Sequence, residues 1–284
     1  MRNLELNLTQ LNVVEAAPGY WRATFSHPPK NLMNSVTATE LRTLVEAAEK
    51  AEDLRVLVFD SADVDYFFAR YDLSAGPLPT VASPTGLPFF IDFTVRLSTL
   101  PVISIAQIAG RARGGGNELA LACDLRYAAL ETAVLGQPEI GSALVPAGGA
   151  MERLVPLVGR SRALEITVTG QDYDAETAER YGWITQALPA ARLAEYVDAL
   201  ASRIARFDGY ALAAVKELAG RSALPDASAL KESADAAARL AVGPGFRPAL
   251  QKVRSQARRA GDDFDLNMGQ HIADAYQDHP TEAY

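Results

Sequence analysis

The sequence is most distinctive at residues 110–124, GRARGGGNELALACD, where three consecutive glycines lead into an apolar run with one acid, Glu118. The pattern predicts a helix over residues 116–123. A helix that begins with glycine has unpaired N–H groups that no side chain shields. Such donors suit either a phosphate group or a reacting carbonyl oxygen that becomes negative, with Glu118 beside it.

A nucleotide-binding loop fits this stretch poorly. The dinucleotide fingerprint G-x-G-x-x-G would place Gly114, Gly116 and a third glycine in register, but the third position is Leu119. The Gly-Lys-Ser/Thr sequence of a P-loop is also missing. The carbonyl interpretation is therefore favoured over the phosphate interpretation.

A second acid, Glu139, follows Pro138 in the predicted loop 136–150, GQPEIGSALVPAGGA. Each glutamate alone has a simpler explanation: Glu118 would complement the dipole of an exposed helix, and Glu139 would be a loop acid. Two glutamates that face one pocket would instead suit paired acid–base chemistry, in which one gives a proton and the other takes one.

The flanking segments alternate between helix and strand, which indicates an α/β fold. A hairpin is predicted around Pro18-Gly19, and Thr37 with Glu40 is interpreted as a capping box that opens a helix. The chain reads as helical from about residue 191 to 261, and a polar tail is expected after that. The predicted division is a core with the active site at 1–205 and a helical region at 206–284. The other predicted helices are 90–100, 151–159 and 174–182, and the predicted strands are 54–61, 102–110, 125–130 and 183–188.

Composition excludes several classes of protein. The net charge of −8 over 284 residues disfavours a nucleic-acid binder. No apolar run approaches the ~18 residues of a membrane span, and no signal peptide is recognised at the N-terminus. The single cysteine, Cys123, permits no internal disulfide, is expected to be buried, and favours a cytoplasmic protein.

Other polar residues give weaker signals. The three histidines, His27, His271 and His279, lack ligand spacing, so no metal site is expected. A cluster of basic residues near the C-terminus is expected to be a solvated face, with anion binding as the alternative; it comprises Arg254, Arg258 and Arg259. Arg111 and Arg113, just before the glycines, are expected to meet either an anionic ligand or solvent.

Four segments resemble the crotonase superfamily, the enoyl-CoA hydratases and isomerases. Residues 108–128 are similar to the glycine-rich oxyanion segment of that family, and residues 135–170 to the segment that follows it. Residues 27–41, HPPKNLMNSVTATEL, are similar to its early loop and first helix, and residues 67–74, FFARYDLS, to its first oxyanion strand end. The similarity spans about residues 10–205.

The resemblance implies a spiral of repeated ββα units and a C-terminal helical region that builds a homotrimer or a dimer of trimers. It implies an acyl-CoA thioester as substrate, with coenzyme A as part of the substrate and no separate cofactor. It assigns the two oxyanion N–H groups to Gly115 and Tyr71, and the catalytic acid–base pair to Glu118 and Glu139. The implied substrate-binding residues are Asn31, Ala69, Arg70, Asp72, Leu73, Gly114, Pro138 and Gly148.

The expected function is hydration of an α,β-unsaturated acyl-CoA through an oxyanion-stabilised enolate. The alternatives are another reaction on the same fold (isomerase, decarboxylase, thioester or carbon–carbon hydrolase) or a non-catalytic acyl-CoA-binding homologue. The family usually has Ala-Gly-Ala-Asp where this chain has Ala69-Arg70-Tyr71-Asp72. Arg70 restricts the backbone there and is a candidate to bind a carboxylate or phosphate. A Tyr71 N–H that is already paired would favour the non-catalytic alternative.

Overall fold

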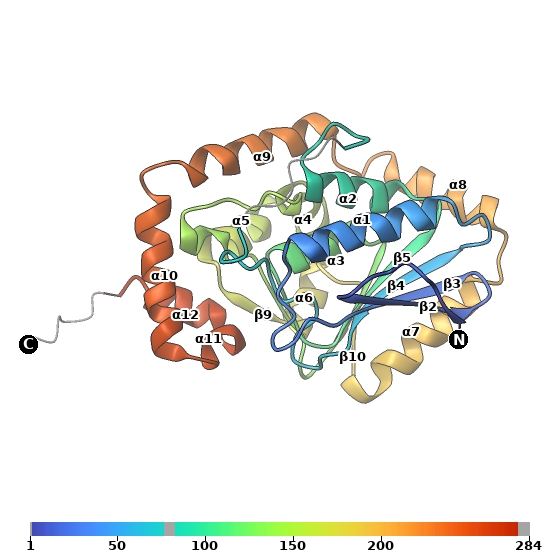
Figure 1. Ribbon diagram of the computed structural model, residues 1–284, viewed down its shortest axis with the longest axis horizontal. Coiled ribbons are helices and arrows are strands. Elements are labelled where there is room, and N and C mark those ends of the chain that lie inside the picture. Colours follow the sequence, from blue (N-terminus) through green and yellow to red (C-terminus); the bar gives the residue numbers. More distant parts are fainter. Residues whose placement is uncertain (1, 77–82, 278–284) are drawn as a thin grey trace, which may run out of the picture.

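The computed structural model describes residues 2–76 and 83–277 and contains two sheets (Figure 1). The larger has the order β1-β2-β3-β4-β5-β7-β10, and the smaller has the order β6-β8-β9. From β3 onward, neighbouring strands of the larger sheet pair in parallel. The strands are β1 (Arg2–Asn3), β2 (Leu11–Ala17), β3 (Tyr20–Phe25), β4 (Val56–Ser61), β5 (Ile103–Ile108), β6 (Arg111–Arg113), β7 (Leu125–Ala129), β8 (Val134–Gly136), β9 (Asp172–Asp174) and β10 (Gln186–Leu188).

Repeated ββα units connect the two sheets. Strand β5 leads into β6 and then α3 (Gly115–Ala122), and β7 leads into β8 and then α4 (Ala150–Val158). Because β6 and β8 pair in parallel in the second sheet, each unit crosses from one sheet to the other in the same sense. The predicted α/β fold of repeated ββα units is thus confirmed, and α3 begins directly after the glycine-rich turn.

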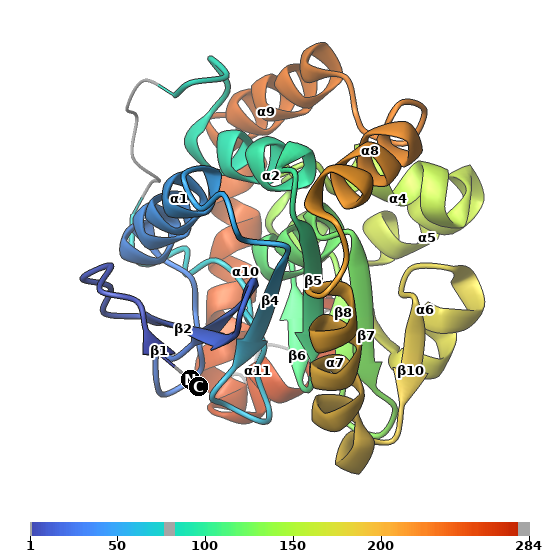
Figure 2. The same cartoon turned by 90° about the vertical axis from the view of Figure 1, so that its right-hand side faces the viewer.

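The remaining helices surround these sheets. Helix α7 packs across β4, β5 and β7 (Figure 2), whereas α1 packs on α2 and α2 packs on α3. Helices α10, α11 and α12 stand together at one end of the molecule (Figure 1). The helices are α1 (Ser35–Glu49), α2 (Phe89–Thr99), α5 (Arg160–Thr169), α6 (Ala175–Tyr181), α7 (Ala190–Ile204), α8 (Gly209–Gly220), α9 (Ala227–Ala241), α10 (Phe246–Ala260), α11 (Asp263–Leu266) and α12 (Met268–Asp274), with a 3-10 turn η1 (Glu139–Ser142).

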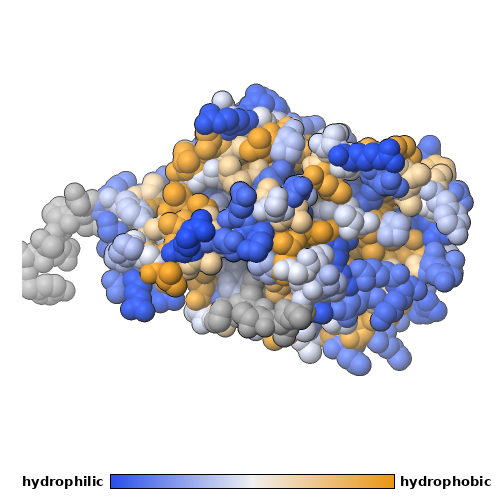
Figure 3. Space-filling model, turned by 90° about the horizontal axis from the view of Figure 1, so that it is seen from above, coloured by the Kyte–Doolittle hydropathy of each residue, from blue (hydrophilic) through white to orange (hydrophobic). Residues whose placement is uncertain are grey.

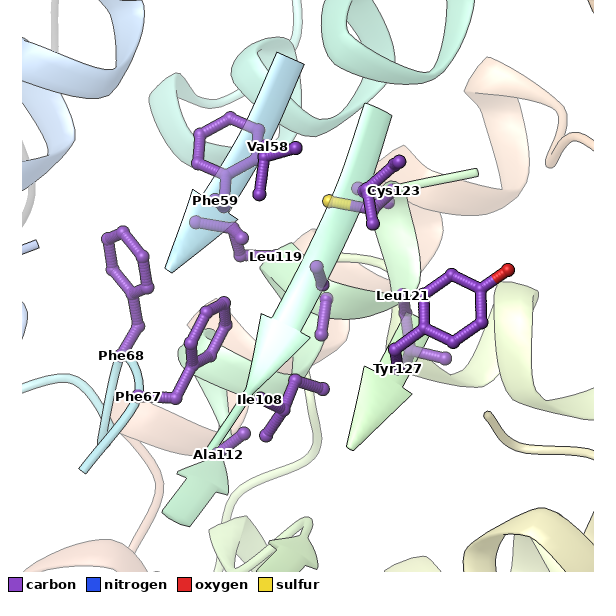
Figure 4. Close-up of a cluster of buried hydrophobic side chains, with 14 of the residues drawn as sticks. Val58, Phe59, Phe67, Phe68, Ile108, Ala112, Leu119, Leu121, Cys123 and Tyr127 are labelled. Carbon is purple, nitrogen blue, oxygen red and sulfur yellow. The ribbon is translucent and has the colours of Figure 1, made fainter. Parts of the chain in front are cut away.

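The core lies around β4, β5, β7 and α3 (Figure 4). Phe59 and Leu119 are fully buried within it, and the stacked pair Phe25 and Phe68 closes it beside the pocket end of the strands. Cys123 is buried in the same cluster, as expected for a small apolar side chain. This packing fixes the start of α3 against the segment that carries Tyr71.

Two local predictions were wrong. Helix α1 begins at Ser35 with Asn34 as its N-cap, and the capping box pairs Asn34 with Thr37 rather than Thr37 with Glu40. The Glu40 carboxylate instead accepts the backbone N–H groups that start β2, from Gln10 and Leu11 at 2.9 Å. A buried carboxylate on the inner face of a helix finds unpaired donors outside it, which local spacing does not reveal.

The expected polar tail after residue 261 is also incorrect within the described part of the chain. Residues 263–274 form α11 and α12, with Phe264, Met268 and Ile272 buried in a small cluster of their own. Their spacing of four residues is that of one helical face, so the sequence did carry this signal. His279 lies outside the described residues.

Candidate functional site

Each glycine of the triplet at 114–116 has different surroundings. Gly114 has φ +49°, and a Cβ there would also lie 2.7 Å from Oε1 of Glu139. A Cβ on Gly116 would lie 1.6 Å from the carbonyl oxygen of Phe68, so only glycine fits against that strand. At Gly115 the same test finds ordinary contact, with Met33 Sδ at 3.5 Å. A side chain would therefore fit at Gly115 without a clash, unlike at Gly114 and Gly116.

The Gly115 N–H, at the start of α3, has no hydrogen-bond partner among the residues that the structure describes. It occupies the first turn, where an N–H has no partner within the helix. The preceding Gly114 N–H donates to the Gly136 carbonyl at 3.0 Å, so the turn itself is fixed. The Gly115 N–H is left at the positive end of the helix, where a developing negative charge is stabilised.

Tyr71 supplies a second donor, because neither of the two neighbouring segments accepts a hydrogen bond from its N–H in the described part of the chain. On one side, the Arg113 N–H donates to Ala69 O at 2.9 Å, and this ladder then ends. On the other side, Met33 donates to Arg70 O and accepts from the Asp72 N–H, each at 2.8 Å, which skips Tyr71. Within the described part of the chain, the Tyr71 N–H has no hydrogen-bond partner.

Glu118 lies one helical turn after Gly114 and is 5% exposed. Its Oε1 accepts the Gly148 N–H at 2.6 Å. Burial raises the pKa of Glu118 above its usual 4.5, while the backbone N–H groups of Gly148 and Ala150 and the charge of Arg153 oppose the rise. The hydrogen bond from Gly148 thus holds the buried Glu118 carboxyl group in one orientation.

Glu139 lies on the other side of the Gly114 turn, at the start of η1. Its Oε2 is buried and has no hydrogen-bond partner within the described chain. Burial raises the pKa of Glu139, and the negative charge of Glu118 raises it further. Two buried carboxyl groups that repel each other favour one ionised and one protonated member at neutral pH.

Both carboxyl groups and both N–H donors open on one cavity of about 1160 Å³. Ten of the twelve site residues named from the sequence line it: Arg70, Tyr71, Asp72, Leu73, Gly114, Gly115, Glu118, Pro138, Glu139 and Gly148. Much of its remaining wall is apolar, and α2, α9, α10, α11 and α12 all contribute to it. Helices from both sides of the predicted division near residue 206 therefore contribute to the pocket.

Asn31 and Ala69 do not line the cavity but support it. Asn31 is buried, its side chain donates to Ser61 Oγ at 2.7 Å, and its carbonyl accepts the Ala69 N–H at 3.0 Å. Asn31 has φ +47°, a conformation that asparagine tolerates better than most residues. These two residues hold the strand end that presents Tyr71.

Of the two arginines before the glycines, Arg113 is buried and paired within the chain, whereas Arg111 is partly exposed to solvent. Arg113 is 2% exposed and pairs with the Asp172 carboxylate at 2.6 and 2.9 Å. Arg111 donates to Leu266 O at 2.9 Å. Arg70, predicted as a candidate for a carboxylate or phosphate, holds a carboxylate of the chain itself, that of Asp265, at 2.7 Å. Within the basic C-terminal cluster, Arg254 lines the cavity, while Arg258 and Arg259 bond to their own helix.

Among residues 2–76 and 83–277, no group of side chains is arranged to hold a metal ion. No helix in those ranges is long and apolar enough to cross a membrane.

Sequence reasoning missed two kinds of pocket residue and one buried arginine beside the pocket. Phe90 of α2 lies against both Gly115 and Gly148, and Met268 and Ile272 of α12 form the distal wall. Arg153 is buried behind Glu118, where it donates to the Gly148 and Gly149 carbonyls at 3.3 Å. The apolar periodicity of residues 264–272 was a usable signal, whereas nothing local marks Phe90 as a pocket residue or Arg153 as a partner of the Gly148 carbonyl.

Known proteins share both the sequence and the architecture. A family model described as enoyl-CoA hydratase/isomerase matches residues 18–241. A Mycobacterium bovis protein named as a probable enoyl-CoA hydratase is 31% identical over 192 residues, which covers 68% of this chain and 74% of that protein. An Arabidopsis thaliana protein named as a probable mitochondrial enoyl-CoA hydratase is 34% identical over 179 residues, covering 62% and 58%.

Among solved structures, a Streptomyces avermitilis protein described as an enoyl-CoA hydratase superposes with a TM-score of 0.86 at 33% identity. The match covers 95% of this chain and 98% of that one, so it includes the C-terminal helices. The family model spans most of the chain, and the relatives agree with it. The chain therefore belongs to the enoyl-CoA hydratase/isomerase family.

Proposed function

We propose that this protein hydrates an α,β-unsaturated acyl-CoA, with coenzyme A carried as part of the substrate. The observation that supports this most directly is the meeting of two unpaired N–H donors, of Tyr71 and Gly115, with two buried glutamates in one cavity. The thioester oxygen would accept both N–H groups. A donor of this kind is worth ~3 kcal/mol in the transition state.

The environments of the glutamates favour different roles. Glu118 accepts backbone N–H groups, which stabilise its ionised form, whereas the buried Oε2 of Glu139 has no hydrogen-bond partner within the described chain. Glu118 would take a proton from water as its oxygen attacks C3. The electron pair of the C2–C3 double bond would move towards the thioester as an enolate. Glu139 would then deliver its proton to C2, and one water has been added in total.

The alternative of a non-catalytic homologue finds no support at Tyr71, whose N–H has no partner in the described part of the chain. Isomerisation uses the same donors and carboxyl groups, so the product must distinguish it from hydration. The test is incubation of the purified chain with short, medium and aromatic enoyl-CoAs. Loss of enoyl thioester absorbance with a mass gain of one water supports hydration. A product of unchanged mass indicates isomerisation, and no turnover of any of them refutes the proposal.

Two variants test the assignment of the acid–base pair. Glu118→Gln and Glu139→Gln should each lower kcat by about 10²–10⁴-fold, because general acid–base catalysis contributes that much. Glu176→Gln is a matched control, since Glu176 is exposed on α6. An unchanged rate in either pocket variant would refute the role of that glutamate.

We further propose a cytoplasmic homotrimer or dimer of trimers. No residue of α8 is buried within the single chain, and its exposed side chains include Tyr210 (90%) and Val215 (66%). Apolar patches interrupt the hydrophilic surface when the molecule is seen from above (Figure 3). Sedimentation should give a mass of three or six chains, and a monomer at micromolar concentration would refute the assembly.

A further inference from the structure

Asp265 of α11 contacts all three segments that frame the proposed oxyanion site. Its Oδ1 accepts Arg70 Nε at 3.0 Å and Nη2 at 2.7 Å, and its Oδ2 accepts Lys30 Nζ at 3.1 Å. Its main-chain oxygen accepts Arg113 Nη1 at 2.7 Å. The residue is 6% exposed, so these charge-assisted hydrogen bonds form largely away from water.

Each of these contacts lies next to a functional backbone group. Arg70 directly precedes Tyr71, and Arg113 lies two residues before Gly115. Lys30 precedes Asn31, whose carbonyl holds the Ala69 N–H. Asp265 thus ties together the two segments that carry the N–H donors and the loop that braces one of them.

The Tyr71 N–H needs such an external support. A backbone N–H inside a sheet has its direction set by its own hydrogen bond, but the Tyr71 N–H has no partner in the described chain. Its direction therefore depends on the neighbouring residues. Met33 holds the backbone on one side, and the fork between Arg70 and Asp265 holds the adjacent side chain.

The segment that carries Asp265 also closes the cavity. Phe264, Met268 and Ile272 line the distal wall, although they pack in a cluster separate from the main core. The segment is fastened to the rest of the chain by polar contacts. The Gly269 N–H donates to Asp172 Oδ2 at 3.0 Å, and Tyr276 Oη donates to Gly141 O at 2.7 Å, beside Glu139.

We propose that Asp265 is a positioning residue. Through Arg70 it fixes the direction of the Tyr71 N–H, and through Arg113 it fixes that of the Gly115 N–H. These directions therefore depend on the docking of α11 and α12. The proposal deepens the function proposed above and rests on it for the identity of the ligand. Arg70 supplies the side-chain tether of this donor through its fork to Asp265.

The test compares Asp265→Asn with Asp262→Asn. Asparagine keeps the size of Asp265 but removes the charge and turns an NH₂ group towards Lys30 or Arg70. Asp262 is a matched control because it also pairs with Lys30, at 3.2 Å, yet its side chain is 98% exposed and it has no bond to Arg70. The principal readout is the thioester C=O stretching frequency of bound ¹³C-labelled butyryl-CoA, a saturated ligand that cannot be hydrated.

In the unmodified protein, the two N–H donors should lower that frequency. In Asp265→Asn the lowering should shrink by at least half, and kcat for an enoyl-CoA should fall by about 10–100-fold with KM within about threefold, because the donors act mainly in the transition state. Asp262→Asn should leave both quantities unchanged. Asp265→Glu should recover part of the loss by restoring the charge.

Arg70→Met provides a second route if Asp265→Asn folds poorly. It keeps the apolar stem of Arg70 and leaves Asp265 paired with Lys30, and it should give the same spectral loss. In the double variant the two losses should not add. An unaltered frequency in Asp265→Asn or Arg70→Met would overturn the proposal, whatever the turnover. A normal frequency shift without any hydration by the unmodified protein would overturn the hydratase assignment alone.

Discussion

Replacement of Gly148 by alanine would test whether the position of the Glu118 carboxylate matters for turnover. A Cβ on Gly148 would lie 2.4 Å from Oε2 of Glu118 and 2.8 Å from Cδ1 of Phe90. The first distance is about 1 Å short of the 3.4 Å at which ordinary contact begins. The carboxylate is the flexible end of a side chain, so we expect it to move by about that amount while the backbone stays.

The expected cost falls on activity rather than on folding. A displacement of ~1 Å at a reacting group lowers the rate about 100-fold. The hydrogen bond from the Gly148 N–H to Glu118 contributes about 1 kcal/mol, and the alanine side chain would weaken it. The melting temperature should therefore fall by only roughly 2–4 °C. Gly245→Ala is the control, because a Cβ there meets only Ala143 Cβ at 3.7 Å and the backbone φ of −76° suits alanine.

The assay measures kcat for enoyl-CoA hydration, with melting temperature and circular dichroism on the same samples. The reasoning is refuted if Gly148→Ala keeps more than about a third of the activity. It is refuted equally if the activity loss is matched by a loss of fold, because the contact would then be structural.

Three further outcomes are expected. Burial and the Glu118 charge raise the pKa of Glu139 on folding, so the folded protein loses stability as the pH rises above the ordinary pKa of 4.5. Glu139→Gln should therefore raise the melting temperature by roughly 2–4 °C at pH 8 and leave it unchanged near pH 4. Burial raises the pKa of the Cys123 thiol to about 12, so a disulfide reagent should label it only after denaturation, and rapid native labelling would contradict this. Lys216 fastens α8 by donating to Asp124 and to the Val102 carbonyl, each at 2.8 Å; Lys216→Met should cost about 1–3 kcal/mol in urea unfolding, and an unchanged unfolding midpoint would contradict its anchoring role.

Much of the fold could be predicted because its signals are local. The hairpin at Pro18-Gly19, the buried strands β4 and β5, and the helix that follows the glycines were each predicted from turn chemistry or apolar periodicity. The helical stretch from residue 191 to 260 was predicted in the same way. Such patterns predict structure because the repeat of apolar residues matches the face of the helix or strand that is buried.

Parts of the candidate site were also readable. The resemblance to the family implied that Glu118 and Glu139 form an acid–base pair, and both residues line the same cavity. The assignment of the second oxyanion N–H to Tyr71 relied on resemblance to the family rather than on spacing. What no pattern predicted was why the Tyr71 N–H is free, since that depends on where two ladders from distant segments stop.

The sequence by itself determined most of the longer strands and helices and the glycine-rich helix start, because these follow from neighbours within a few residues. Only the tertiary structure decided the partners of the charged groups. Arg113 meets Asp172 and Arg70 meets Asp265, across 59 and 195 positions of the chain. Glu40 likewise serves β2 instead of its own helix. A buried charge pairs with whatever opposite charge or unpaired backbone group packing brings near it, and only the folded chain sets that proximity.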